Sequence, residues 1–118
     1  MPKDLSIGVL LDFYGELLTP KQRDALDSYY NQDFSLAEIA QHMEISRQGV
    51  RDFIKRGEKQ LTDLENALGL AKRFSAISAE FEKAAAQLKK LEALEHEPAA
   101  ARAIRRLGAS LSNIQTYL

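Results

Sequence analysis

Residues 35–54, SLAEIAQHMEISRQGVRDFI, carry the start and stop signals of two short helices joined by a tight turn. Ser35 is followed three residues later by Glu38, a capping-box pattern, so we expect a helix to begin at this point. The pattern is interrupted at Glu44, and Ser46 has the residue type of an N-cap for a second helix. The stretch therefore predicts two helices with a turn of a few residues between them.

The apolar residues of this stretch recur at helical spacing, which gives each expected helix one inward face. These residues are Ile39, Ala40 and Met43 in the first helix and Val50, Phe53 and Ile54 in the second. The small side chain of Ala40 would let the helices cross closely, so the pattern predicts a helix-turn-helix. Glu44 is expected to take the left-handed conformation that the turn needs, in spite of the strain. A small bundle of amphipathic helices would show a similar pattern by chance, and the sequence leaves this alternative open.

The second expected helix concentrates positive charge. Residues 46–60 hold five basic and two acidic residues, a local net charge of +3, in a chain whose net charge is −1. Side chains at the start of such a helix reach base edges when it enters the major groove of DNA. Arg47 and Gln48 are therefore candidates for base contacts, and Lys55 and Arg56 for phosphate contacts. The full set of candidate DNA-binding residues is Ser46, Arg47, Gln48, Arg51, Lys55, Arg56 and Lys59.

The composition limits the class of protein. The chain has 118 residues, 45% of them apolar, and only two valines, so we expect a single all-α protein rather than a disordered or β-rich one. It contains no cysteine, which excludes disulfides and thiolate chemistry. No apolar run approaches the roughly 18 residues of a membrane span and no signal-peptide pattern opens the sequence, so we expect a cytoplasmic location. The net charge of −1 predicts modest affinity for nucleic acid and strong salt dependence.

Two further helices are expected before the central stretch. Residues 4–18 predict the first. Thr19, Pro20 and Gln22 form the start signal of the next helix, which is expected to run to about Tyr30. The residues expected to face inward are Leu10, Phe13, Tyr14, Leu17 and Leu18 in the first helix and Leu26, Tyr29 and Tyr30 in the second.

After the central stretch, the helix is expected to continue to Leu68 and to end at Gly69. Apolar residues then step by three and four in a heptad pattern, which residues 96–98 interrupt. Two heptad-like helices joined by a short turn predict an antiparallel hairpin. We therefore expect a helix-turn-helix domain over residues 1–69 and a C-terminal helical hairpin over residues 70–118.

The heptad pattern leaves open whether the hairpin closes on itself or pairs with another chain. Our hypothesis is a homodimer in which Phe74, Ile77 and Phe81 form the centre of the contact.

Several stretches resemble region 4 of bacterial sigma factors, the module that reads promoter DNA. They are residues 18–26 (LTPKQRDAL), Tyr29-Tyr30, residues 35–40 (SLAEIA) and residues 46–50 (SRQGV). The sequence is still more similar to the YlxM family of small helix-turn-helix proteins, on these features and on residues 11–14 (LDFY), Ile54-Lys55-Arg56 and a leucine-rich tail. The resemblance covers residue 9 to about residue 74. It implies a helix-turn-helix fold and, through gene neighbourhood, a link to the signal recognition particle.

No catalytic or metal-binding pattern is present in the sequence. His42 and His96 have no second ligand at metal spacing, and no nucleotide-binding glycine motif occurs, so we expect no enzyme and no cofactor. Two hypotheses remain. The chain is a DNA-binding regulator, which the local charge of residues 46–60 favours. Alternatively it is an adaptor that binds signal recognition particle protein or RNA, which the low net charge favours.

Overall fold

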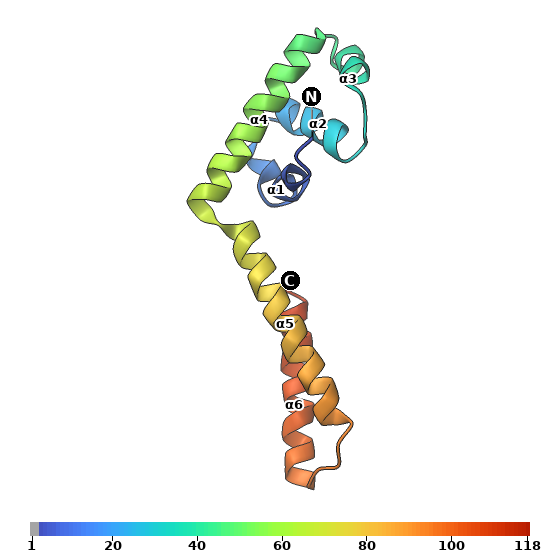
Figure 1. Ribbon diagram of the computed structural model, residues 1–118, viewed down its shortest axis with the longest axis vertical. Helices are drawn as coiled ribbons and strands as arrows, with labels where there is room; N and C mark the ends of the chain where they lie inside the picture. Colours follow the sequence, from blue (N-terminus) through green and yellow to red (C-terminus); the bar gives the residue numbers. More distant parts are fainter. Residues whose placement is uncertain (1–2) are drawn as a thin grey trace. The chain divides into compact units, whose positions relative to one another are not determined.

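The computed structural model describes residues 3–118, all of whose regular structure is helical, and confirms the predicted all-α class (Figure 1). The chain divides into two compact units, one ending at Ala71 and the other comprising Lys72–Leu118. The elements are α1 (Ser6–Tyr14), the 3-10 turn η1 (Gly15–Leu17), α2 (Pro20–Tyr30), α3 (Leu36–Met43), α4 (Arg47–Leu68), α5 (Leu70–Glu92) and α6 (Pro98–Gln115). Within the described range no helix is long and apolar enough to cross a membrane. The predicted limits of independently folding domains, 1–69 and 70–118, stay a prediction.

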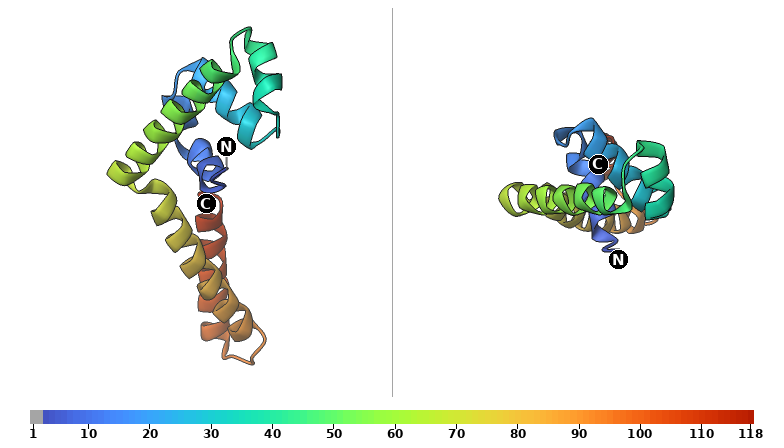
Figure 2. Two further views of the ribbon diagram at one scale, coloured as in Figure 1. Left: turned by 45° about the horizontal axis from the view of Figure 1, so that its top comes forward. Right: turned by 90° about the horizontal axis from the view of Figure 1, so that it is seen from above.

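Helix α4 is the central helix of the first unit, because the other helices of this unit pack on it. It packs on α1, α2 and α3, which lie on one side of it (Figures 1 and 2). The buried core residues are Ile7, Leu11, Tyr14, Leu18, Ala25, Leu26, Tyr29, Ile39, Ala40, Val50, Ile54 and Leu61. The predicted inward residues of the helix-turn-helix thus lie in or against one common core.

The predicted first helix, residues 4–18, is shorter in the structure. Helix α1 ends at Tyr14 and continues as the turn η1, after which Leu18 is extended, with ψ of 160°. Pro20 disfavours a helical conformation at the residue before it, so the chain straightens ahead of α2. Because a 3-10 turn has about 3.0 rather than 3.6 residues per turn, Leu17 is rotated to the surface, where it is 60% exposed. Its predicted inward position is therefore wrong.

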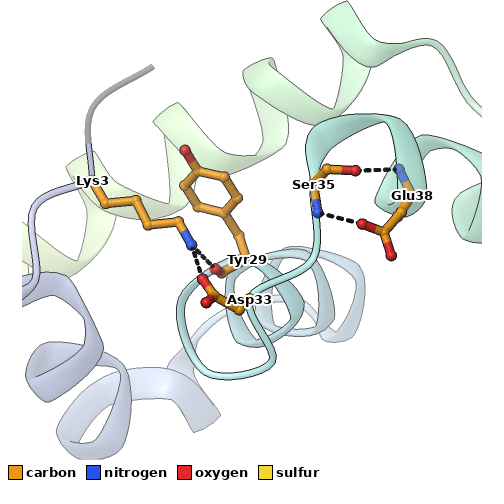
Figure 3. A network of polar contacts seen from close by, with 5 residues as sticks. All are labelled: Lys3, Tyr29, Asp33, Ser35 and Glu38. Carbon is orange, nitrogen blue, oxygen red and sulfur yellow. Dashed lines mark hydrogen bonds and ion pairs between the residues drawn. The ribbon is translucent and has the colours of Figure 1, made fainter.

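Both predicted capping boxes are present and set the starts of α2 and α3. The Thr19 hydroxyl accepts from the backbone N–H of Gln22 at 3.3 Å. The Ser35 hydroxyl accepts from the N–H of Glu38, and the Glu38 carboxylate accepts from the N–H of Ser35, each at 3.1 Å (Figure 3). These side chains satisfy donors that the first turn of a helix leaves without partners.

The ammonium group of Lys3 holds the turn between α2 and α3 in place. The Lys3 Nζ donates to the backbone carbonyl of Tyr29 and to the Asp33 carboxylate, each at 2.7 Å (Figure 3). Asp33 has φ of 59°, a left-handed conformation that the sequence did not predict. The hydrogen bond and charge of Lys3 hold the pKa of Asp33 below its usual value. The ion pair thus ties the start of the chain to a strained turn.

Gly57 of α4 lies in close contact with α2. A Cβ atom at this position would lie 2.5 Å from Cδ1 of Leu26, a fully buried residue of α2. Any side chain here would force Leu26 to move within a filled core. Ala40, the small residue singled out in the sequence, is buried as expected, but no sequence pattern indicated this contact at Gly57.

Two tyrosine–glutamate hydrogen bonds reinforce the contacts of α4. Tyr30 of α2 donates to Glu58, and Tyr14 of α1 donates to Glu65 at 2.7 Å. Burial, and then the hydrogen bond with the glutamate, raises the pKa of each phenol above its usual range. The same Tyr14 oxygen accepts from the N–H of Leu70 at 3.0 Å, so α1 also caps the first turn of α5.

The second unit is the predicted antiparallel hairpin of α5 and α6, which run side by side (Figures 1 and 2). The hairpin buries few of its side chains. Leu88 is the one side chain in the described part of this unit that counts as buried, and α6 buries none. Gly108 of α6 lies over Leu88, where a Cβ would meet Cδ2 of Leu88 at 3.5 Å. The two helices therefore approach each other where Gly108 faces Leu88.

A first prediction concerns Gly57. We expect Gly57→Ala to destabilise the protein by about 1–2 kcal/mol, because overpacking against Leu26 outweighs a gain in helix propensity of about 1 kcal/mol. In a Leu26→Ala background the obstructing atoms are gone, and Gly57→Ala should become stabilising. Urea unfolding of the four variants of this double-mutant cycle measures the sign in each background. A stabilised Gly57→Ala single variant would contradict the close contact.

A second prediction concerns Tyr30. We expect Tyr30→Phe to cost about 1–2 kcal/mol at neutral pH, because Glu58 loses a donor. Since the folded-state pKa of Tyr30 is raised, the stability it contributes is full below about pH 10 and declines above it, as the unfolded chain ionises first. Unfolding of Tyr30→Phe should therefore depend less on pH in this alkaline range. Tyr117→Phe, at an 87% exposed site, is the control and should behave like the unchanged protein.

Candidate nucleic-acid interface

The turn between α3 and α4 has the geometry that the sequence predicted. Glu44 is left-handed, with φ of 57° and ψ of 41°. Its N–H bonds to the carbonyl of Gln41 at 3.4 Å, and the N–H of Ile45 bonds to the carbonyl of Ala40 at 3.1 Å. This pair of bonds is a Schellman motif, which satisfies the last carbonyls of α3 and turns the chain sharply. The prediction for Glu44 is confirmed.

Helix α4 begins as expected at a serine cap. The Ser46 hydroxyl accepts from the N–H of Gly49 at 3.0 Å. Val50, Ile54 and Gly57 then point into the core. Because these residues occupy one side of the helix, the residues between them are directed to solvent.

All seven predicted contact residues are exposed, and they fall into two groups. Arg47, Arg51 and Lys55 follow each other at intervals of four residues, so they form one ridge along about 12 Å of the helix. Within the described part of the chain, none of the three forms a hydrogen bond or an ion pair through its side chain. We refer to Arg47, Arg51 and Lys55 as the basic ridge.

The other polar candidates are engaged with neighbours on α4. Gln48 donates to the carboxylate of Asp52 at 3.3 Å. Arg56 donates to the backbone carbonyl of Asp52 at 3.3 Å, and Lys59 pairs with Asp63 at 2.8 Å. Exposed contacts of this kind contribute about 0–1 kcal/mol, so a ligand could replace them at small cost.

Phe53 and Asp52 contribute to this surface in ways that the sequence analysis did not assign. Phe53 packs against the core as predicted but is only half-buried, and its ring centroid lies 5.4 Å from the guanidinium carbon of Arg56. Asp52 accepts a hydrogen bond from Gln48 through its carboxylate and one from Arg56 through its backbone carbonyl. Their spacings of three and four residues are the signal that could have indicated these contacts.

Acidic residues limit the positive field of this face. Asp52 lies on the exposed side of α4, and Glu38 and Glu44 are exposed on α3 and in the turn. His42 of α3 stacks on Phe34, with 5.8 Å between centroids. Among residues 3–118 there is no group of three or more His, Cys, Asp or Glu residues arranged to hold a metal ion. The chemistry that this face offers is recognition by hydrogen bonding and charge.

Comparison with known proteins gives one family. The model of the UPF0122 family, described as "Putative helix-turn-helix protein, YlxM / p13 like", matches residues 1–99. A UPF0122 protein of Thermoanaerobacter sp. (strain X514) is 37% identical over 110 residues, which cover 93% of this chain and 94% of the relative. UPF0122 proteins of Acetivibrio thermocellus and Clostridium kluyveri are 54% and 56% identical over 74 and 70 residues, and each match covers 63% of the relative.

A third prediction concerns the strained turn. We expect Glu44→Gly to stabilise the protein by about 1 kcal/mol, because glycine takes the left-handed conformation without steric cost. Glu44→Ala removes the same charge but keeps a Cβ, so it should give little of this gain. Thermal or urea unfolding compares the two. Equal effects of both variants would mean that charge, and not backbone strain, sets the contribution of this position.

Proposed function

The chain belongs to the UPF0122 family of YlxM / p13-like helix-turn-helix proteins, and we propose on this basis that it binds double-stranded DNA through the exposed start of α4. In this proposal α4 enters the major groove with its first turns, as the second helix of a helix-turn-helix does. The protein then acts as a non-enzymatic regulator of transcription in the cytoplasm. The link to the signal recognition particle stays a prediction from the sequence resemblance.

The basic ridge is the observation that carries this proposal. Arg47, Arg51 and Lys55 are exposed, evenly spaced and without ion-pair partners in residues 3–118, so no interaction must be broken before they meet phosphate. The adjacent side of α4 is held in the core by Val50 and Ile54, which fixes the direction in which the ridge faces. A rigid helix presents such groups with little loss of conformational freedom.

The candidate residues of α4 are assigned to base edges or to phosphate according to their distance from the start of the helix. Ser46, Arg47 and Gln48 are nearest the end that points into the groove, and they are assigned to base edges, where a good pair contributes about 1–3 kcal/mol of discrimination. Lys55, Arg56 and Lys59 lie roughly two to three turns further on and are assigned to the phosphate backbone. Arg51 lies between these groups.

The surrounding charge sets the strength of binding. The whole chain carries a net charge of −1, and Asp52 lies among the assigned residues. The attraction to phosphate is therefore local, and we expect weak binding that depends steeply on salt. Specific recognition would then depend on the few base contacts at the start of α4.

A fourth prediction tests this proposal. We expect the triple variant Arg47→Gln, Arg51→Gln, Lys55→Gln to lose binding to a labelled random-sequence duplex at low salt. Because Lys55 is assigned to phosphate and Arg51 lies next to it, the log–log slope of affinity against salt should fall in magnitude by about 0.9 for one lost phosphate contact or about 1.8 for two. Fluorescence anisotropy at several salt concentrations gives both quantities, and circular dichroism checks that helix content is unchanged.

The matched control is Lys83→Gln, Lys89→Gln, Lys90→Gln, which removes three charges from exposed positions of α5. This control should keep the affinity and the salt slope of the unchanged protein. Equal losses in both triple variants would show a dependence on net charge alone. Undiminished affinity in the α4 variant would overturn the proposed interface.

A further inference from the structure

The charge of this protein is divided unevenly between its two units. Residues 1–71 hold eight basic and twelve acidic residues, a net charge of −4, whereas residues 72–118 hold eight basic and five acidic residues, a net charge of +3. The helix-turn-helix unit is therefore acidic as a whole, and the hairpin is basic. A charge difference of this kind between two parts of a chain indicates contact with a polyanion, either nucleic acid or an anionic membrane surface.

Helix α6 carries three arginines within five residues and has no acidic residue of its own. Arg102, Arg105 and Arg106 are all exposed. Within residues 3–118 none of the three forms a hydrogen bond or an ion pair through its side chain. On α5, by contrast, Lys83 is paired with Glu80 at 3.2 Å. The positive charge of α6 is therefore available to a ligand.

Two of these arginines lie on the side of α6 that is turned away from α5. The partly buried residues Ala101, Ile104 and Gly108 mark the side that faces α5. At 3.6 residues per turn, Arg102 and Arg106 lie roughly opposite that side. Because they are four residues apart, they are also neighbours on the helix surface. We refer to Arg102 and Arg106 as the arginine pair.

The surroundings of the arginine pair favour a phosphate backbone over a membrane surface. Ala109 and Asn113 continue the same outer side of α6, and both are exposed. A small side chain leaves room for a ligand, and an amide can donate to a phosphate oxygen. A helix that lies on a membrane needs large apolar side chains beside its cations, and this side of α6 has none between Arg102 and Asn113.

The third arginine of α6 has a different environment. Arg105 lines the polar side of the seam together with Glu82 and Glu92. Carboxylates near it reduce the attraction that its charge exerts on an anion. Arg105 is therefore not part of the proposed contact.

The arginine pair is a cost to α6 as long as no anion is bound. Like charges four residues apart destabilise a helix. Packing offsets little of this repulsion, since none of the described residues of α6 is buried. The N-cap residue, Glu97, makes no side-chain hydrogen bond to the first turn either. An anion bound by both guanidinium groups would relieve the repulsion between them.

We propose that the arginine pair of α6 binds the phosphate backbone of double-stranded DNA, as a second contact in addition to that of α4. A guanidinium group matches the geometry of a phosphate through two parallel hydrogen bonds. Only Gly69 separates α4 from α5, so the hairpin is tethered to any DNA that α4 holds, and two weak contacts in one chain reinforce each other. The proposal deepens the DNA binding proposed above and rests on it for the choice of ligand.

The test is the double variant Arg102→Gln, Arg106→Gln, measured by fluorescence anisotropy with a random-sequence duplex. Two lost phosphate contacts should reduce the magnitude of the log–log salt slope by about 1.8. Between about 50 and about 200 mM salt, the unchanged protein should then lose about twelvefold more affinity than the variant does. Thermal unfolding without DNA should show the variant to be at least as stable as the unchanged protein, because the repulsion is gone.

The matched control is Lys83→Gln, Lys90→Gln, which removes the same charge from the same unit. Both lysines are exposed, and they lie roughly opposite the partly buried Phe81 and the buried Leu88, on the side of α5 turned away from α6. The control also frees Glu80 from its ion pair, so a general effect of charge would be easier to detect in it. We expect it to keep the affinity and the salt slope of the unchanged protein.

The outcomes separate this proposal from that for α4. The arginine-pair contact is overturned if Arg102→Gln, Arg106→Gln keeps the salt slope of the unchanged protein, or if the control loses as much of it. Measured beside the α4 triple variant, a loss confined to the α4 variant supports the proposed function and overturns the hairpin contact. A loss confined to the arginine-pair variant supports the hairpin contact and overturns the proposed interface on α4.

Discussion

The contact between α2 and α4 at Gly57 is the constraint on which the first unit depends. Because Gly57 has no side chain, Leu26 lies directly against the backbone of α4, 2.5 Å from where a Cβ would be. Close packing at this point brings Val50, Ile54 and Leu61 into the same core as α1 and α3. The side of α4 that is buried determines which side remains outside, so the direction of the basic ridge follows from this contact.

Helix α4 also links the two ends of its unit. At its start, the Schellman turn at Glu44 and the Ser46 cap set where α4 begins relative to α3. At its end, Gly69 is left-handed, and the N–H groups of Leu70 and Ala71 are accepted by Tyr14 and Glu65. These contacts set where the 22-residue helix α4 begins and satisfy two N–H groups in the first turn of α5, which directly follows it.

Two features of the structure cost the chain stability. A glutamate occupies the left-handed turn next to α4, at an expense of roughly 1–2 kcal/mol, where glycine would fit without strain. The hairpin leaves Ile77, Leu107 and Ile114 about half exposed. Local arrangements that are unfavourable for an isolated chain are often found where a protein meets a partner.

The sequence by itself determined the helices, their caps and the turn, because capping boxes, helical apolar spacing and a C-terminal glycine act within a few residues of each other. Ser35, Ser46, Glu44 and Gly69 all behave as their local signals predict. The seven candidate contact residues were all found at the surface, since the period of the helix turns them away from the apolar face.

What only the tertiary structure decided is which helices meet and where. The η1 turn that exposes Leu17 and the approach of Leu26 to Gly57 both depend on how chain segments pack in space. The same holds for how little of the hairpin is buried, since Leu88 alone is buried in its described part although the heptad pattern supplies many apolar positions.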